Sequence, residues 1–259
     1  MLKLHADSHA MARETWMIVV LILLLALPGA GLAQDGQGVL TPENANEARL
    51  NRLQPPDQVM DAIGIEPGML GAEIGAGRGR YVVQLAVRVG ESGKVYAEDI
   101  DAAALGHLEQ RCERWGLTNV ETIIGDVTDP KLPEGELDFI FIISSYHHFA
   151  DPVTLLRNAR ASLKHDGMLA IGEWLPSDEN DRETTSPEEM EAEMAAAGYQ
   201  LERIETFLEA NNMYIYVFRT GEAYRDARAA KRFFRKLLKG QGSEPWLQRR
   251  TFRRPAFAL

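Results

Sequence analysis

The chain has 259 residues, of which 45% are hydrophobic and 25% are charged, and its formal net charge at pH 7 is −10. These values are ordinary for a globular protein of one or two domains with a sizeable core. The single cysteine, Cys112, excludes an intrachain disulfide, and it has no spaced partners that predict a metal site.

The N-terminus has the composition of a targeting segment. Residues 16–27 are an almost uninterrupted apolar run, preceded by Lys3 and Arg13 and followed by small residues up to Ala33. This order predicts a signal peptide over residues 1–33, cleaved near Ala33, and an exported protein, periplasmic or secreted. The alternatives are a buried helix or a membrane anchor at 16–27, although a bilayer-spanning helix needs roughly 20 apolar residues.

A polar Gly-rich linker at 34–40 is expected to precede the main domain, residues 41–219. Thr41 and Pro42 predict the N-cap and the first residue of a helix. A second short helix is predicted over residues 57–63, after the two prolines at 55 and 56.

Residues 69–80 read MLGAEIGAGRGR, a short apolar run that reaches Glu73 and is followed by three glycines at alternate positions. Residues 81–89 then place apolar side chains at helical spacing, so we predict a strand, a tight turn and a helix. Such a turn lets a ligand approach the main chain, beside unpaired N–H groups of the helix. The alternative is a Gly-rich turn without a ligand.

The spacing of the glycines distinguishes between nucleotide ligands. A dinucleotide-binding loop has its third glycine where this chain has Arg80. The acidic Glu73 also disfavours a pyrophosphate and favours a cationic ligand.

From residue 69 on, Val- and Ile-rich runs alternate with helical patterns, which predicts an α/β fold with a parallel sheet covered on both faces. Ser186 is predicted to cap a helix that runs to Ala197, and two final strands are close enough for an antiparallel hairpin. After the glycine loop, strands are predicted at 94–98, 120–124, 137–143, 168–172, 199–208 and 213–218, and helices at 102–115 and 152–163.

The last 40 residues differ from the rest in charge. From Thr220 on, 11 Lys and Arg stand against 3 Asp and Glu. Residues 222–239 have an apolar face and a basic remainder, which predicts an amphipathic helix in a C-terminal tail, 220–259. It either contacts an anionic membrane surface or packs on the acidic domain.

The pattern E-x-G-x-G-x-G, with acidic residues ending the next two strands, resembles the class I S-adenosylmethionine-dependent methyltransferases over roughly residues 41–218. The resemblance implies a doubly wound, seven-stranded, mostly parallel sheet with a terminal antiparallel strand pair, a Rossmann-like fold. It also implies S-adenosylmethionine as cofactor. The cofactor-binding residues that it implies are Glu73, Gly75, Gly77, Gly79, Asp99, Ile100, Asp126, Val127 and Ser144.

The resemblance gives these residues individual roles. Asp99 corresponds to the acid that accepts both ribose hydroxyls, although the neighbouring Glu98 leaves open which acid does so. Ile100 and Val127 would lie against the adenine and Asp126 would accept its amino group. Ser144 is the candidate for a backbone contact to the methionine moiety.

A base is needed only if the methyl acceptor must lose a proton. Tyr146, His147 and His148, after the fourth strand, and Glu173, at the end of the fifth, are the candidates. Each histidine alone can equally be a packing residue. Arg78 and Arg80 are candidates to pair with the cofactor's carboxylate, or they are surface charges.

The sequence therefore predicts a methyltransferase acting on an acceptor, expected to be a small molecule, that it does not identify. No aromatic or basic patch of the core indicates nucleic acid. The alternatives are a non-catalytic exported protein that keeps the fold and an NAD(P)-dependent oxidoreductase, which Arg80 disfavours.

Overall fold

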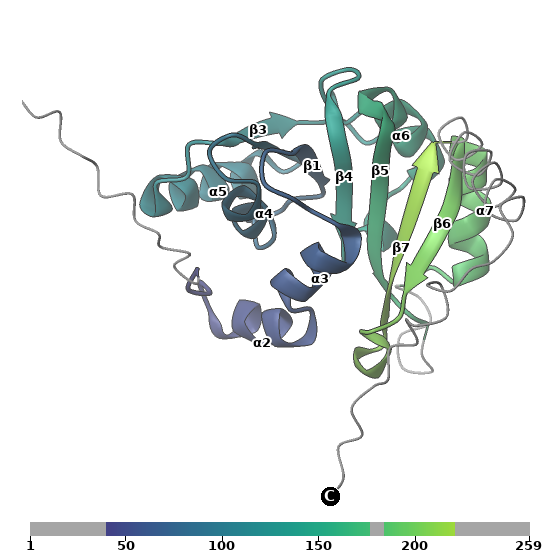
Figure 1. Cartoon of the computed structure of the whole chain (residues 1–259), viewed down its shortest axis with the longest axis horizontal. Coiled ribbons are helices and arrows are strands. Elements are labelled where there is room, and N and C mark those ends of the chain that lie inside the picture. The colour runs from purple at the N-terminus through teal and green to yellow at the C-terminus, as the bar shows by residue number, and fades with distance from the viewer. Residues whose placement is uncertain (1–39, 177–183, 221–259) are drawn as a thin grey trace, which may run out of the picture. The chain divides into compact units, whose positions relative to one another are not determined.

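The computed structural model describes residues 40–176 and 184–220 (Figure 1). The predicted signal peptide, the linker up to residue 39 and the basic tail from residue 221 lie outside the described residues. Across the two described ranges, no helix combines the length and the apolar character that crossing a membrane requires.

The described residues form one seven-stranded sheet. Its strands are β1 (Leu70–Ile74), β2 (Lys94–Asp99), β3 (Val120–Ile124), β4 (Leu137–Ile143), β5 (Leu163–Trp174), β6 (Tyr199–Glu205) and β7 (Met213–Thr220). They lie in the order β3-β2-β1-β4-β5-β7-β6. β1 to β5 are parallel, and β7 is antiparallel to both β5 and β6. This confirms the predicted doubly wound sheet with its terminal antiparallel pair.

Helices cover both faces of the sheet. They are α3 (Pro56–Ile63), α4 (Val82–Val89) and α5 (Ala102–Trp115) on one face, and α6 (Pro152–Ala159) and α7 (Pro187–Ala197) on the other. Alternation along β4 divides its side chains between them: Phe139 and Phe141 pack in the first cluster, Ile140 and Ile142 in the second. A central strand that is buried on both sides reads as a continuous apolar run, which is why the sequence predicted it well.

The first described helix begins later than predicted. α2 (Ala45–Leu53) is capped by Asn44, whose side chain accepts a hydrogen bond from the backbone N–H of Glu47 at 2.9 Å. The prediction of Thr41 as N-cap was therefore wrong. Asn caps a helix at least as well as Thr, and it stands three residues before an acidic residue of the first turn.

Two further boundaries differ from the prediction. The helix predicted over 152–163 ends at Ala159 and continues as a 3₁₀ turn, η2 (Arg160–Ser162). β5 begins at Leu163, which pairs with Leu137, and a register shift follows before Phe139 pairs with Met168. Residues 164–167, between the predicted helix and the predicted fifth strand, thus form an irregular extension of this strand.

Candidate functional site

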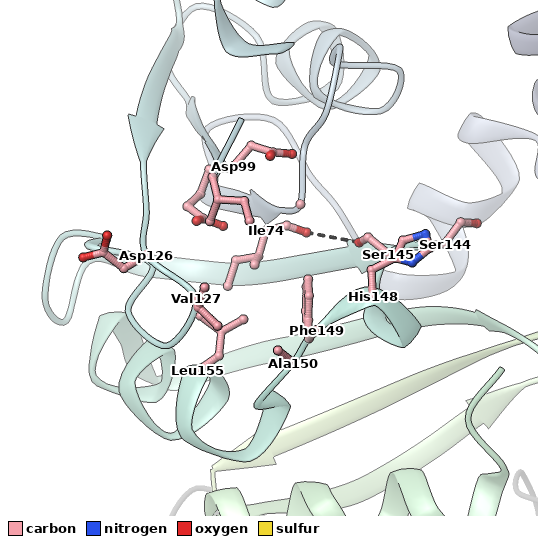
Figure 2. Close-up of a pocket in the computed structure, with 13 residues that line it drawn as sticks. Ile74, Asp99, Asp126, Val127, Ser144, Ser145, His148, Phe149, Ala150 and Leu155 are labelled. Carbon is pink, nitrogen blue, oxygen red and sulfur yellow. Dashed lines mark hydrogen bonds between the residues drawn. The ribbon is translucent and has the colours of Figure 1, made fainter. Parts of the chain in front are cut away.

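A cavity of about 410 Å³ opens at the carboxyl ends of β1 and β2, where the strand order reverses between β1 and β4. The segments that follow β3 and β4 complete its walls (Figure 2). In doubly wound sheets, ligands bind in the crevice at this reversal. The structure therefore brings together the four strand ends that the sequence indicated.

The three glycines of the loop after β1 all have positive φ, but each has a different structural role. Gly75 borders the cavity, and a Cβ there would lie 2.8 Å from Ser145 Oγ. Gly77 donates its backbone N–H to Asp99 Oδ2 at 2.7 Å. A Cβ on Gly79 would lie 2.2 Å from Leu108 Cδ1, so this glycine serves the packing of α5 and does not border the cavity.

Asp99 ends β2 and lines the cavity. Its Oδ2 accepts the Gly77 N–H, and its Oδ1 accepts the backbone N–H of Asp101 at 2.9 Å. Each oxygen of a carboxylate can accept two hydrogen bonds, so each keeps one site for a ligand. The backbone contacts fix the carboxylate in place and leave it able to bind a pair of hydroxyls.

The neighbouring acid, Glu98, also borders the cavity but is only 3% exposed. Its carboxyl lies against Gly125, where an added Cβ would be 1.8 Å from Glu98 Oε1. Burial raises the pKa of Glu98 to about 8; the Gly75 N–H opposes this rise and the Asp99 charge adds to it. Near neutral pH this carboxyl therefore keeps its proton.

Apolar side chains lie beside Asp99. Ile100 and Val127 are 61% and 52% exposed, which is high for large apolar residues, and both line the cavity. In Figure 2, Asp126 lies at the left end of the cavity and Ser144 and His148 lie at the right end. The Asp126 carboxylate pairs with Lys131 at 3.0 Å.

Glu73 is not a cavity residue in this structure. It is 3% exposed, and among the described residues its Oε2 has no hydrogen-bond partner. Burial raises its pKa to about 8, although the Arg80 guanidinium opposes this rise. A carboxyl with an unpaired buried oxygen therefore stands in β1, two residues before Gly75.

The segment after β4 is held by a residue that the sequence did not indicate. Ser144 has a φ of 54°, unusual for a residue with a side chain. Its backbone N–H donates to Gly172 O at 2.9 Å, and its hydroxyl accepts a hydrogen bond from Gln54 Nε2 at 3.0 Å. Gln54 is fully buried and lies 90 residues away in the chain, so no local pattern could have revealed it.

Three of the four predicted base candidates occupy the 3₁₀ turn η1 (Tyr146–His148), and the structure separates them. Tyr146 is 2% exposed and its hydroxyl is hydrogen-bonded to Glu193, away from the cavity lining. His148 lines the cavity. His147 lies next to it, with ring centroids 4.0 Å apart, and its Nδ1 is 2.8 Å from Glu173 Oε1.

Neither arginine of the loop borders the cavity. Arg78 is exposed and contacts His107 Nδ1 at 2.8 Å. Arg80 donates to Asn51 and to Gln54, and its guanidinium lies 4.5 Å from the centre of the Tyr81 ring. Both side chains have protein partners that account for their positions.

Comparisons with known proteins agree with this geometry. A family model described as a methyltransferase domain matches residues 72–167. Nocamycin O-methyltransferase of Saccharothrix syringae is 30% identical over 115 residues, 44% of this chain and 41% of that protein. Demethylmenaquinone methyltransferase of Geobacillus kaustophilus is 27% identical over 112 residues, 43% of this chain and 48% of that protein. The chain thus spans less than half the length of these curated relatives.

A solved structure extends the likeness to most of the described residues. A SAM-dependent methyltransferase from Aquifex aeolicus is 26% identical, with a TM-score of 0.61, over 69% of this chain and 98% of that one. Residues 72–167 thus match a methyltransferase-domain family, and the fold of the described residues is similar to that of class I S-adenosylmethionine-dependent methyltransferases.

Proposed function

We propose that the protein transfers the methyl group of S-adenosylmethionine to a small-molecule acceptor. The observation that carries the proposal is the wall formed by Asp99, Ile100 and Val127. It combines a carboxylate fixed by the Gly77 N–H at 2.7 Å with two apolar side chains left 61% and 52% exposed. Apolar surface exposed at a cavity with a few fixed polar groups is the usual form of a small-ligand site.

The residues fit a nucleoside that carries a positive charge. Asp99 has two free acceptor sites for the ribose hydroxyls, and the adenine fits between Ile100 and Val127, toward Asp126. Gly75 lacks the Cβ that would narrow the cavity toward Ser145. The cofactor supplies the methyl group already activated, so the protein has to bind it, exclude water and orient the acceptor.

A dinucleotide fits less well. Its pyrophosphate would lie at the loop, where the Asp99 carboxylate accepts the Gly77 N–H that a phosphate would need. The position of the third glycine of a dinucleotide loop holds Arg80, whose side chain is engaged with Asn51 and Gln54.

Calorimetric titration of the full chain distinguishes these ligands. We expect S-adenosylhomocysteine to bind at one site and NAD to give no heat of binding. Binding of NAD without binding of S-adenosylhomocysteine contradicts the proposal and favours an oxidoreductase.

The acceptor class rests on the relatives. One is named for nocamycin and one for demethylmenaquinone, and both names denote small molecules. We assign the acceptor to the space next to Ser144 and His148, which lie at the end of the cavity away from Asp126. We expect methyl transfer to small organic acceptors and none to an RNA or DNA substrate, measured by release of S-adenosylhomocysteine.

We also propose, from composition alone, that residues 1–33 direct export and are removed near Ala33. N-terminal sequencing of the protein from cells tests this, and a retained Met1 or Met11 contradicts cleavage.

We likewise propose that residues 222–239 contact anionic membranes. Salt-sensitive binding of the full chain to anionic vesicles, lost when this segment is deleted, supports it.

A further inference from the structure

A second polar cluster lies next to the cavity residue His148 and centres on Glu173, near the end of β5. Glu173 is 1% exposed, and its carboxylate accepts three hydrogen bonds. They come from His147 Nδ1 at 2.8 Å, from the His147 backbone N–H at 3.3 Å and from the Trp174 backbone N–H at 2.8 Å. Three donors satisfy the acceptor sites of this buried carboxylate.

This arrangement fixes the tautomer of His147. Glu173 offers only acceptors, so the His147 proton must be on Nδ1, and Nε2 is left with its lone pair. A carboxylate on the far side of an imidazole also stabilises the cation that forms when Nε2 takes up a proton, as in other His–carboxylate pairs. His147 is therefore prepared to act as a base through a defined atom.

The position of the pair points to the acceptor end of the site. The His147 ring is 4.0 Å from the His148 ring, centre to centre, and His148 lines the cavity. The His147 side chain is 11% exposed, so it is reachable without being fully solvated. His148 has no carboxylate partner among the described residues, and Tyr146 is engaged with Glu193.

We propose that His147 Nε2 takes the proton of a hydroxyl acceptor during methyl transfer, with Glu173 as the residue that positions His147. This inference rests on the proposed methyltransferase function and narrows its substrate to alcohols and phenols. The acceptor oxygen bonds to the methyl carbon while the carbon–sulfur bond breaks and its electron pair goes to sulfur. The hydroxyl proton goes to His147 Nε2 and then to water.

The acceptor class follows from the need for a base. A neutral hydroxyl is a weak nucleophile, and removal of its proton by a positioned base typically raises the rate by about 10²–10⁴-fold. A neutral amine attacks through a free lone pair and needs no base before the transfer. A buried His–carboxylate pair next to the cavity would therefore assist methylation of a hydroxyl but would have no role in methylation of an amine.

An acceptor-independent experiment tests the tautomer. In the full chain labelled with ¹⁵N-histidine, NMR should show His147 protonated at Nδ1 and unprotonated at Nε2. The substitution Glu173→Leu keeps a similar side-chain volume but removes both acceptor oxygens, and it should abolish this preference. A wild-type His147 that carries its proton on Nε2 overturns the proposal.

Turnover tests the role of the pair. The probes are phenol, catechol and 1-naphthol, each compared with the amine of the same ring system. We expect the wild type to methylate the hydroxyl probes. In His147→Gln, kcat should fall at least about 100-fold while KM changes less than twofold. In Glu173→Gln, the loss of kcat should be smaller. Methylation of the amines but not the hydroxyls, or a His147→Gln enzyme with more than half the wild-type kcat, overturns the proposal.

Two controls separate failure of this inference from failure of the proposed function. S-adenosylhomocysteine should bind wild type, His147→Gln and Glu173→Gln with equal affinity, which shows that the fold and the cofactor site are intact. The matched control is His107→Gln, because His107 forms another His–Glu pair, 2.7 Å from Glu43, outside the cavity lining. This variant should retain wild-type turnover. If the wild type does not bind S-adenosylhomocysteine, the proposed methyltransferase function itself is refuted.

Discussion

The two sides of the cavity are built differently. On the β1–β2 side, the cavity residues lie at the end of their strand or directly after it, as in Gly75 after β1 and Asp99 at the end of β2. On the β4–β5 side, the contacts join segments distant in the chain, such as Gln54 with Ser144 and His147 with Glu173. A local strand–turn–helix pattern can encode the first side, whereas only the folded sheet creates the second.

The largest expected effect comes from filling the β1–β2 side. Gly75→Ala places a Cβ 2.8 Å from Ser145 Oγ at a φ of 73°, so we expect the affinity for S-adenosylhomocysteine to fall. The reduction should be at least about 100-fold, or roughly 2.7 kcal/mol, by calorimetry.

Gly116→Ala is the matched control for Gly75→Ala. Gly116 also has a positive φ, 64°, but an added Cβ there meets nothing within 4 Å. It should lose about 1–2 kcal/mol of stability through backbone strain and bind the ligand normally. Equal losses of affinity in both variants mean that strain alone, and not the cavity wall, explains the effect.

The next effect concerns the acid at the end of β2. Asp99→Ala removes two charge-assisted hydrogen bonds to the ligand and should weaken binding of S-adenosylhomocysteine by about 10–100-fold. Asp101→Ala removes an N-cap that accepts from Ala103 and Ala104, so it should cost about 1 kcal/mol of stability and leave affinity unchanged. If Asp99→Ala binds as tightly as wild type, the ribose is held elsewhere.

A third prediction concerns the buried carboxyl of Glu73, two residues before the glycine loop. The pKa of Glu73 is raised from 4.5 to about 8, so the folded protein holds this proton more tightly than the unfolded chain does. Its contribution to stability is complete below pH 4.5 and is lost as the pH rises to 8, with a slope of up to about 1.4 kcal/mol per pH unit. Denaturant unfolding at several pH values should show Glu73→Gln with a flatter profile than wild type. An unchanged slope contradicts the assignment.

The smallest effect is expected at Arg78. Its exposed side chain contacts His107 and does not border the cavity. Arg78→Ala should therefore change the affinity for S-adenosylhomocysteine by less than about twofold, a difference below 0.5 kcal/mol. A loss of tenfold or more would mean that Arg78 turns to meet the carboxylate of the cofactor.

The sequence predicted more of the β1–β2 side of the cavity, whose residues lie close together in the chain, than of the β4–β5 side. The run ending in Glu73, the glycines and the apolar strands indicated the sheet and its switch point because each signal lies within a few residues. It missed Gln54, because a lone glutamine before two prolines carries no sign of the partner 90 residues away. It also grouped Tyr146 with the histidines, since adjacent residues in a 3₁₀ turn point in different directions and only packing shows which of them is buried.

The roles of the glycines show the same limit at a finer scale. Their spacing predicted a loop against which a ligand could lie, but only Gly75 borders the cavity. Gly79 is required by the Leu108 side chain of α5, which the sequence could not place next to it.

A structure of the full chain with S-adenosylhomocysteine tests the central claim most directly. We predict the ribose hydroxyls within hydrogen-bond distance of both Asp99 oxygens and the adenine between Ile100 and Val127. The sulfur should lie toward Ser144 and His148. A complex in which the nucleoside lies outside this cavity, or in which Asp99 makes no contact with the sugar, contradicts the account.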